Sequence, residues 1–327
     1  MAEQAKMSAF AKYAWFALGY NVLVIVWGVF LRASKSGDGC GEHWLTCNGE
    51  LIPSAPQFKT VIEFSHRMTT AVDGIVMLIL LAWAVKIFFA KRDTPSGHVL
   101  YAAVGSMFFV ITEAAVGAGL VLTGNTAEAV TDVRPLWAMG HLINTFILLT
   151  FLTLTAWLAA QLRNLEQVRE KRSFSARREI DWKVIFLIAI GVLGLLFVGL
   201  SGSLAALSSM LFPSETLAEG IAKDFSETSN MILRLRLSHP ILSILTAVYL
   251  IFLAGWLKAK SGGEARVTWW SNAVSVLVIG QVIFGGATLL TLGPIVMQLG
   301  HLLLADLVWI GFVLLVANYF SRRENIY

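Results

Sequence analysis

Four histidines lie at matching places along the chain, each just inside the start of an apolar stretch long enough to cross a membrane. They are His66, His141, His239 and His301, two in each half of the sequence. Neutral imidazole is the commonest metal ligand in proteins. Two facing helices that each offer one histidine form the arrangement that holds a haem iron between them. The placement therefore predicts one haem site in each half.

The composition places these histidines in a membrane protein. The 327 residues are 57% hydrophobic and 14% charged, with a mean hydropathy of +0.71, whereas a soluble domain carries about 25% charged residues. Crossing a bilayer requires about 20 apolar residues, and we expect the first apolar stretch to be a retained helix because it lacks a cleavage pattern. The predicted fold class is an all-α integral membrane protein with eight transmembrane helices. The predicted spans are 12–31, 61–89, 98–122, 137–161, 183–208, 231–257, 268–291 and 297–320.

Basic residues in the short connections predict the orientation. Residues 162–183 carry seven of them, and Lys91, Lys258 and Arg322 fall on the same side. We expect this side to be cytoplasmic, with both termini there, in the cell (inner) membrane. The basic run of 162–183 is then a solvated linker, an interpretation that we prefer to a nucleic-acid role.

The linker 162–183 divides the chain into two similar halves, 1–161 and 184–327. Because each half has an even number of helices, the two copies share one orientation and are related by an axis along the membrane normal. We therefore predict two pseudo-symmetric four-helix bundles, with all four histidines near the outer surface. The alignment pairs Gly117–Gly124 with Gly286–Gly293, Glu113 with Gln281, and Met139-Gly140-His141 with Leu299-Gly300-His301.

The two halves differ beside their first histidine. Glu63 precedes His66 by three residues, which places both side chains on one face of a helix. Arg236 occupies the corresponding position before His239. A carboxylate beside a metal centre is able to move protons, whereas a cation pairs with anions such as haem propionates. We therefore predict chemistry in the first half and a permanent cofactor in the second.

Other ionisable residues fall near or within the spans. Arg67 and Arg134 are candidate propionate contacts in the first half, with snorkelling to the interface as the alternative, and Arg236 is the candidate in the second. Buried acids are costly in hydrocarbon and tend to be functional. Asp73, two turns below His66, is a candidate for a proton path, but the first interpretation of Asp73, Glu113 and Asp306 is a structural polar contact.

The chain has two cysteines, Cys40 and Cys47, and both lie in the first outer loop. The outer compartment is oxidising, so we predict that they form a disulfide. The bridge is interpreted as a structural staple. The alternative is a redox-active pair that cycles during turnover, because exposed bridges can be the labile ones.

Together these features resemble the heme A synthase family, in order and over nearly the whole chain. The resemblance implies an enzyme that oxidises the C8 methyl group of heme O to a formyl group, giving heme A for terminal oxidases. It also implies that the first pair binds the substrate heme O, that Glu63 is the catalytic carboxylate, and that the second pair ligates a resident haem b. The motifs that carry it are Glu63-x-x-His66-Arg67, the loop Cys40-Gly41-Glu42-His43-Trp44-Leu45-Thr46-Cys47 with its polar lead-in 32–39, and His141, His239 and His301.

Two features depart from the family pattern. Some relatives carry a second cysteine pair in the outer loop of the second half, but residues 209–230 have none. We expect packing of apolar side chains to replace that bridge, and the candidates are Leu217, Ile221 and Phe225. Pro240 follows His239 where an arginine would match the first half, and a proline can kink its helix.

Two other functions agree with four membrane histidines. One is a bis-histidine membrane cytochrome that relays electrons without oxidising a substrate, and the other is a haem transporter. Neither explains why Glu63 accompanies one pair alone. The expected partners are membrane lipid and heme O or heme A. The electron donor, the origin of the formyl oxygen, docking with a heme O synthase and assembly as a homo-oligomer are left open by the sequence.

Overall fold

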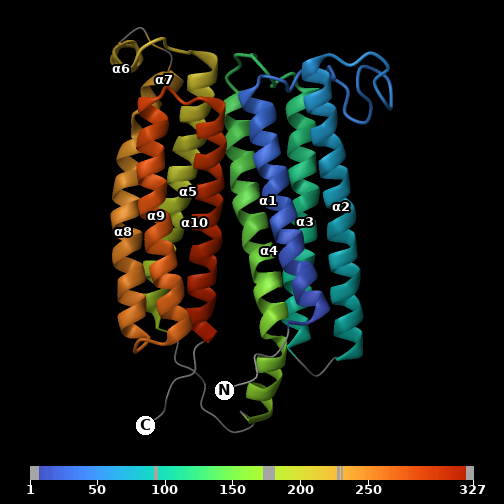
Figure 1. Ribbon diagram of the computed structural model, residues 1–327, viewed down its shortest axis with the longest axis vertical. Coiled ribbons are helices and arrows are strands. Elements are labelled where there is room, and N and C mark those ends of the chain that lie inside the picture. Colours follow the sequence, from blue (N-terminus) through green and yellow to red (C-terminus); the bar gives the residue numbers. More distant parts are fainter. Residues whose placement is uncertain (1–6, 92–94, 172–180, 227–228, 230, 322–327) are drawn as a thin grey trace.

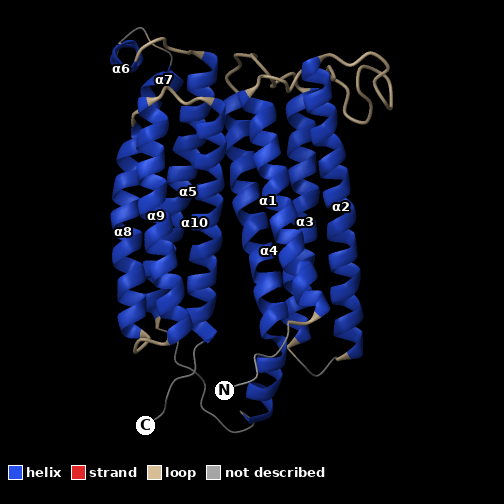
Figure 2. Cartoon of the chain, viewed as in Figure 1, coloured by secondary structure: helices blue, strands red, loops and turns tan. Residues whose placement is uncertain are grey.

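The computed structural model describes residues 7–91, 95–171, 181–226, 229 and 231–321. Within these residues the chain forms helices and no strand (Figure 2). Eight segments of this described part are long and apolar enough to cross a membrane, so the predicted fold class is confirmed and the chain is a multi-pass membrane protein. The helices are α1 (Ala9–Ala33), α2 (Phe58–Ala90), α3 (Ser96–Leu122), α4 (Arg134–Lys171), α5 (Trp182–Leu211), α6 (Leu217–Phe225), α7 (Met231–Arg236), α8 (Ser238–Lys260), α9 (Ala265–Leu290) and α10 (Ile295–Ser321).

The spans form two bundles that stand side by side (Figure 1). Helices α1 to α4 make up one bundle and α5, α8, α9 and α10 the other, with α6 and α7 at the end that also carries the longer loops. One buried apolar core lies among α1 to α4 and includes Trp309, Ile310 and Leu314 of α10, and a second lies within α5, α8, α9 and α10. Trp309 of α10 joins them, because its ring stacks on Phe146 of α4 at 4.5 Å and its indole N–H donates to Thr150 Oγ1 at 2.9 Å.

The fourth span ends at Leu162, as predicted to within one residue, but its helix extends into the predicted linker. Helix α4 continues to Lys171, past the expected boundary at residue 161, and α5 begins at Trp182. Residues 172–180 of the predicted linker lie outside the described residues. The hydropathy of a helix falls where it leaves the bilayer, but its backbone hydrogen bonds continue for as long as the sequence favours a helix, so the apolar stretch marked only the end of the span.

The sixth span is broken near its outer end, at Leu237 between α7 and α8. Pro240 explains the position of the break. A proline has no N–H to donate to the carbonyl four residues earlier, which is that of Arg236, and its ring clashes with that carbonyl. The break places His239 in the first turn of α8.

The register of the internal repeat follows from how α3 and α9 end. Each helix ends at a capping threonine, Thr123 or Thr291, followed by a residue with positive φ. Glu113 and Gln281 each lie ten residues before that threonine, so the predicted correspondence of these two residues is right. The same register pairs Gly117 with Gly285.

The predicted pairing of Gly117 with Gly286 is therefore wrong by one residue. Gly285 and Gly286 are adjacent glycines, so the sequence alone allows Gly117 to correspond to either of them. The caps distinguish the two registers, because a 6→1 backbone bond closes each helix end: Asn125 N–H donates to Leu120 at 2.9 Å and Gly293 N–H to Thr288 at 2.8 Å.

The expected apolar packing in 209–230 is wrong for two of its three residues. Ile221 and Phe225 of the short helix α6 are 47% and 73% exposed. A buried ion pair holds this loop instead, with Arg236 Nη2 2.7 Å from Asp224 Oδ1. The same guanidinium donates to the Gly220 carbonyl at 3.1 Å. An ion pair thus ties α6 to α7 in the loop that contains no cysteine.

Candidate functional site

The second-half pair, His239 of α8 and His301 of α10, has a separation that suits a shared metal ion. The ring centres are 6.3 Å apart and the ring planes lie at 84° to each other. Bonds from imidazole nitrogen to a metal are about 2 Å long, so two rings that share one metal ion have centres roughly 6 Å apart. The two helices therefore hold their imidazoles at a distance that accommodates one haem iron.

Glycines on neighbouring helices make room for these two rings. A Cβ atom at Gly202 of α5 would lie 2.9 Å from His239 Cε1, and one at Gly285 of α9 would lie 2.7 Å from His301 Cε1. Real Cβ atoms essentially never approach that closely. Glycine at both positions is thus required for the rings to occupy their observed places.

The contacts of the ring nitrogens also agree with metal binding by these two histidines. His239 Nδ1 lies 3.2 Å from Ser201 Oγ, a contact that would fix the ring while the other nitrogen binds a metal. His301 Nδ1 is buried without a partner among the described residues, and Gln281 Nε2 lies 3.5 Å from His301 Nε2. Buried polar atoms without partners are rare in folded proteins. The paired rings, their glycines and this nitrogen fit a haem in the second half.

The first half repeats part of this arrangement. His66 of α2 lies against Gly28 of α1, where a Cβ atom would come within 3.0 Å of the imidazole Cε1. His66 Nδ1 is buried and has no described partner. His141 lies on α4 of the same bundle (Figure 1). The structure thus packs His66 against a glycine, as it packs His239 and His301, and the pairing of His66 with His141 stays a prediction.

His141 has an acidic neighbour on α3. Its Nδ1 lies 3.0 Å from Glu113 Oε1, although the ring N–H does not point along a good hydrogen-bond direction. Glu113 also accepts from Asn144 Nδ2 and, at 2.5 Å, from the hydroxyl of Thr145. The sequence interpretation of Glu113 as a structural polar contact is therefore incomplete, since one of its contacts is a candidate haem ligand.

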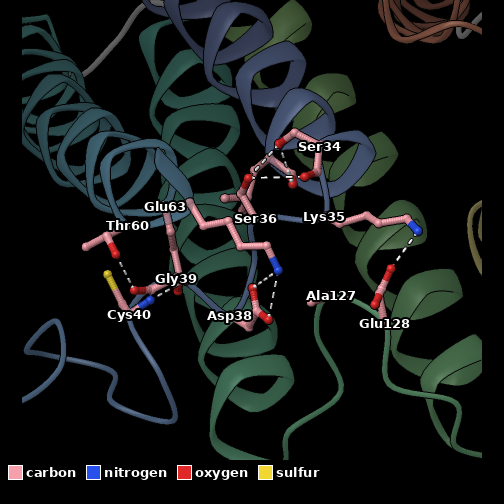
Figure 3. Close-up of polar contacts among 12 residues, drawn as sticks. Ser34, Lys35, Ser36, Asp38, Gly39, Cys40, Thr60, Glu63, Ala127 and Glu128 are labelled. Carbon is pink, nitrogen blue, oxygen red and sulfur yellow. Dashed lines mark hydrogen bonds and ion pairs between the residues drawn. The ribbon is translucent and has the colours of Figure 1, made fainter. Parts of the chain in front are cut away.

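The predicted catalytic acid, Glu63, is 2% exposed and has two partners of its own. Its Oε2 accepts the Cys40 backbone N–H at 2.8 Å, and its Oε1 lies 2.5 Å from Arg67 Nη2. Figure 3 shows Glu63 beside Cys40 and Gly39, whose carbonyl accepts from Thr60 at 2.8 Å. Glu63 therefore fastens the first outer loop to α2, and its catalytic role stays a prediction.

The first outer loop is closed and tied to the helices around it. Cys40 and Cys47 form a disulfide. Lys35, at the end of α1, lies 2.6 Å from Glu128 of the second outer loop (Figure 3), and this hydrogen bond lowers the pKa of the exposed Glu128 carboxyl. Both first-half loops are thus held over the outer ends of α1 to α4.

Arg67 and Arg134, two of the candidate propionate contacts, already have protein partners. Besides Glu63, Arg67 donates to the carbonyls of His43 and Thr46 at 2.6 and 2.9 Å. Arg134 is buried and donates to loop carbonyls, with Ala127 O at 2.5 Å. Arg236 is likewise engaged with Asp224 and Gly220, as described above. A propionate contact by any of the three stays a prediction. Such a contact would add to these hydrogen bonds or replace them.

Arg32 is a candidate that the sequence analysis missed. This residue lies at the outer end of α1, and its charge is within electrostatic range of both Arg134 and His141. Among the described residues its guanidinium has no hydrogen-bond or ion-pair partner. The signal was present in the sequence, because Arg32 lies at the end of its span away from the predicted cytoplasmic side, against the positive-inside pattern.

Asp73 and Asp306 have no hydrogen bond or ion pair to a histidine among the described residues. Asp73 Oδ2 accepts from Asn21 Nδ2 of α1 at 2.8 Å, a polar contact between two helices. Asp306 of α10 is 1% exposed, and its Oδ2 has no partner among the described residues. The contact of Asp73 agrees with a structural role.

These features define a class: an α-helical membrane protein of two bundles, each with a pair of histidines near the same end. A family model described as cytochrome oxidase assembly protein (COX15-CtaA) matches residues 11–313. The chain belongs to this family, and the predicted resemblance is confirmed.

Curated relatives fall into two groups. One is a protoheme IX farnesyltransferase of Thermus thermophilus, 38% identical over 316 residues, which are 96% of this chain and 49% of that protein. The chain thus spans about half the length of this relative. The other group consists of heme A synthases, such as those of Lysinibacillus sphaericus and Shouchella clausii. Both are 26% identical, over 90% and 88% of this chain and 91% and 89% of their own lengths.

Proposed function

We propose that this chain is a heme A synthase, an enzyme that oxidises the C8 methyl group of heme O to a formyl group. The observation that carries the proposal is the end-to-end match with proteins named heme A synthase, over about nine-tenths of both chains. Paired histidines at one end of each bundle support it. They supply two places for a porphyrin, as an enzyme with a substrate haem and a resident haem requires.

In this proposal the second half holds the resident haem b. His239 and His301 would be its ligands, and Gly202 and Gly285 would leave space for the two rings. A haem held by two histidines supplies reversible one-electron transfer. The protein's part is to fix the rings, through the Ser201 contact to His239 and the close packing of His301 on Gly285.

The first half would bind the substrate heme O through His66 and His141. Arg32 would attract a propionate of the substrate, because it is the cation in this region that lacks a partner among the described residues. Holding the substrate by its iron and its carboxylates fixes the position of its C8 methyl group, and orientation of this kind accounts for a large part of enzymatic rate enhancement.

Glu63 would accept a proton at one of its carboxylate oxygens during the oxidation. Arg67 stabilises the ionised carboxylate, which prepares Glu63 as a base. A proton added at Oε2 would weaken the hydrogen bond that this oxygen accepts from the Cys40 N–H. Movement of the disulfide loop and protonation of Glu63 would thus be linked.

The orientation and the partners are also proposals. We place the ends at Ala9 and Ser321 on the cytoplasmic side of the cell membrane, because the basic connections lie there. The Thermus relatives carry the name protoheme IX farnesyltransferase on a protein about twice as long as the segment matched here. This supports a heme O synthase as the neighbour that supplies the substrate, while the electron donor is a separate partner.

One observation favours a membrane cytochrome that only relays electrons. Both carboxylate oxygens of Glu63 are already bonded within the protein, as a purely structural residue would be. The test is extraction of haems from a host that makes heme O, with and without this chain. A heme A synthase produces heme A there, whereas an electron relay or a haem transporter leaves heme O unchanged.

A further inference from the structure

The two halves place side chains of equal length but different charge against their second histidine. Glu113 of α3 lies 3.0 Å from His141 Nδ1, and Gln281 of α9 lies 3.5 Å from His301 Nε2. The two residues occupy the same register, ten positions before the capping threonine of each helix. The repeat therefore keeps the register and the length of this side chain but changes its charge, and the two side chains contact different nitrogens of their imidazoles.

A network of polar side chains fixes the Glu113 carboxylate. The Thr112 hydroxyl donates to Asn144 Oδ1 at 2.7 Å, so the amide presents its NH₂ group to the carboxylate, which accepts it. Thr145 donates to the other carboxylate oxygen at 2.5 Å. Glu113 thus accepts bonds from two residues on α4 near His141, and the network holds the carboxylate at the imidazole edge.

We propose that Glu113 is a positioning residue that makes His141 a stronger electron donor to the first-half iron, and that Gln281 withholds this effect from the second half. The inference rests on the proposed function, because it assigns His141 and His301 as haem ligands. A ligand histidine commonly donates its other ring N–H to a carboxylate, which fixes the ring and raises its basicity. A neutral amide has no charge with which to do so.

The consequence is a difference between the two irons. A more basic imidazole stabilises the oxidised iron relative to the reduced iron, so the first-half haem has the lower reduction potential of otherwise equal sites. A lower potential at the first-half haem than at the second would let electrons pass from the first half to the second. A neutral partner suits the half whose iron passes electrons on. The Glu113/Gln281 difference, on α3 and α9, thus agrees with the different roles of the two halves. Those roles were proposed from Glu63 and Arg236, on α2 and α7.

The test is a redox titration of the purified full chain with heme O and haem b bound, followed by optical spectroscopy. The His301→Ala background identifies the first-half signal. Glu113→Gln, which copies the second half, is expected to favour the reduced first-half iron about tenfold, or 59 mV for one electron, and to leave the second-half potential unchanged. The reciprocal Gln281→Glu is expected to lower the second-half potential by a similar amount.

A purely structural Glu113 would change the melting temperature and leave both potentials in place. The inference is overturned if Glu113→Gln binds both haems and changes the ratio of oxidised to reduced first-half iron less than twofold. If Glu113→Gln fails to fold or loses its haem, Gln281→Glu decides, and an unchanged second-half potential overturns it. The readout does not need turnover, so variants that show these shifts while the wild-type chain makes no heme A contradict only the proposed function. A wild-type chain that binds no haem in its first half contradicts both.

Discussion

The Glu63 carboxylate and the Cys40 backbone N–H are joined by a 2.8 Å hydrogen bond, so the proposed base and the disulfide loop form one unit. Arg67 extends it, because its guanidinium contacts both Glu63 and carbonyls of the same loop. Chemistry at Glu63 and the position of the loop are therefore linked, and substitutions here separate the enzyme from an electron relay.

Glu63→Gln is expected to abolish heme A formation while haem b stays bound. The amide still accepts the Cys40 N–H, but it neither accepts a proton as a carboxylate does nor pairs with Arg67. Haem extraction and the optical spectrum of the purified variant measure the two quantities. Arg67→Gln is the matched control, because it breaks the same ion pair and leaves the carboxylate; it should retain part of the activity. Full heme A yield from Glu63→Gln would show that the acid is only structural.

Gly285→Ala is expected to weaken haem binding in the second half about tenfold or more, the range seen when groups that orient a metal ligand are changed. The new Cβ would lie 2.7 Å from His301 Cε1, so the ring must move. Haem b retained per chain after purification is the measurement. Gly280→Ala on the same helix is the control, because nothing lies within 4 Å of its added Cβ. Equal haem content in the two variants would argue against His301 as a ligand.

Arg32→Gln is expected to lower the affinity for heme O roughly tenfold to a hundredfold, since a hydrogen bond to a charged group contributes about 1.5–3 kcal/mol. Binding is measured by optical titration of heme O into the purified chain. Lys35→Gln is the control, because that cation lies at the same end of α1 but is paired with Glu128. If the two variants bind equally well, Arg32 does not contact the substrate.

Removing the disulfide by Cys40→Ala with Cys47→Ala is expected to destabilise the protein by about 2–3 kcal/mol, the effect of opening a short loop. Thermal unfolding in detergent measures it. A structural staple leaves the heme A formed per folded chain unchanged below the melting temperature. A redox-active pair would instead stop turnover in protein that is fully folded, which would contradict the interpretation as a staple.

The sequence predicted the eight spans because each needs only a run of apolar residues, and it located the four histidines because they recur at the outer ends of those spans. Contacts between distant residues were beyond its reach. The sequence suggested that Arg67 binds propionate, but the fold of the first outer loop brings carbonyls to its guanidinium. Glu113 reaches His141 because α3 and α4 pack antiparallel with a side-chain network between them.

Local features of the chain could be predicted in part from the sequence. Pro240 signalled a disturbed helix, and the structure shows the break at Leu237. The buried pair of Arg236 with Asp224 was not foreseen, because the amphipathic helix α6 that carries the aspartate was taken as part of a loop. Arg32 was not singled out, although a cation at the end of a span away from the predicted cytoplasmic side is itself a signal of an anionic ligand.

Haem extraction from three strains that make heme O tests the central claim most directly: one expresses the wild-type chain, one His66→Ala and one His301→Ala. We predict heme A in the membranes of the wild-type strain and not in those of the His66→Ala strain, with haem b retained by purified His66→Ala protein and lost from His301→Ala. Heme O alone in the wild-type strain, despite folded chain carrying haem b, would contradict the account.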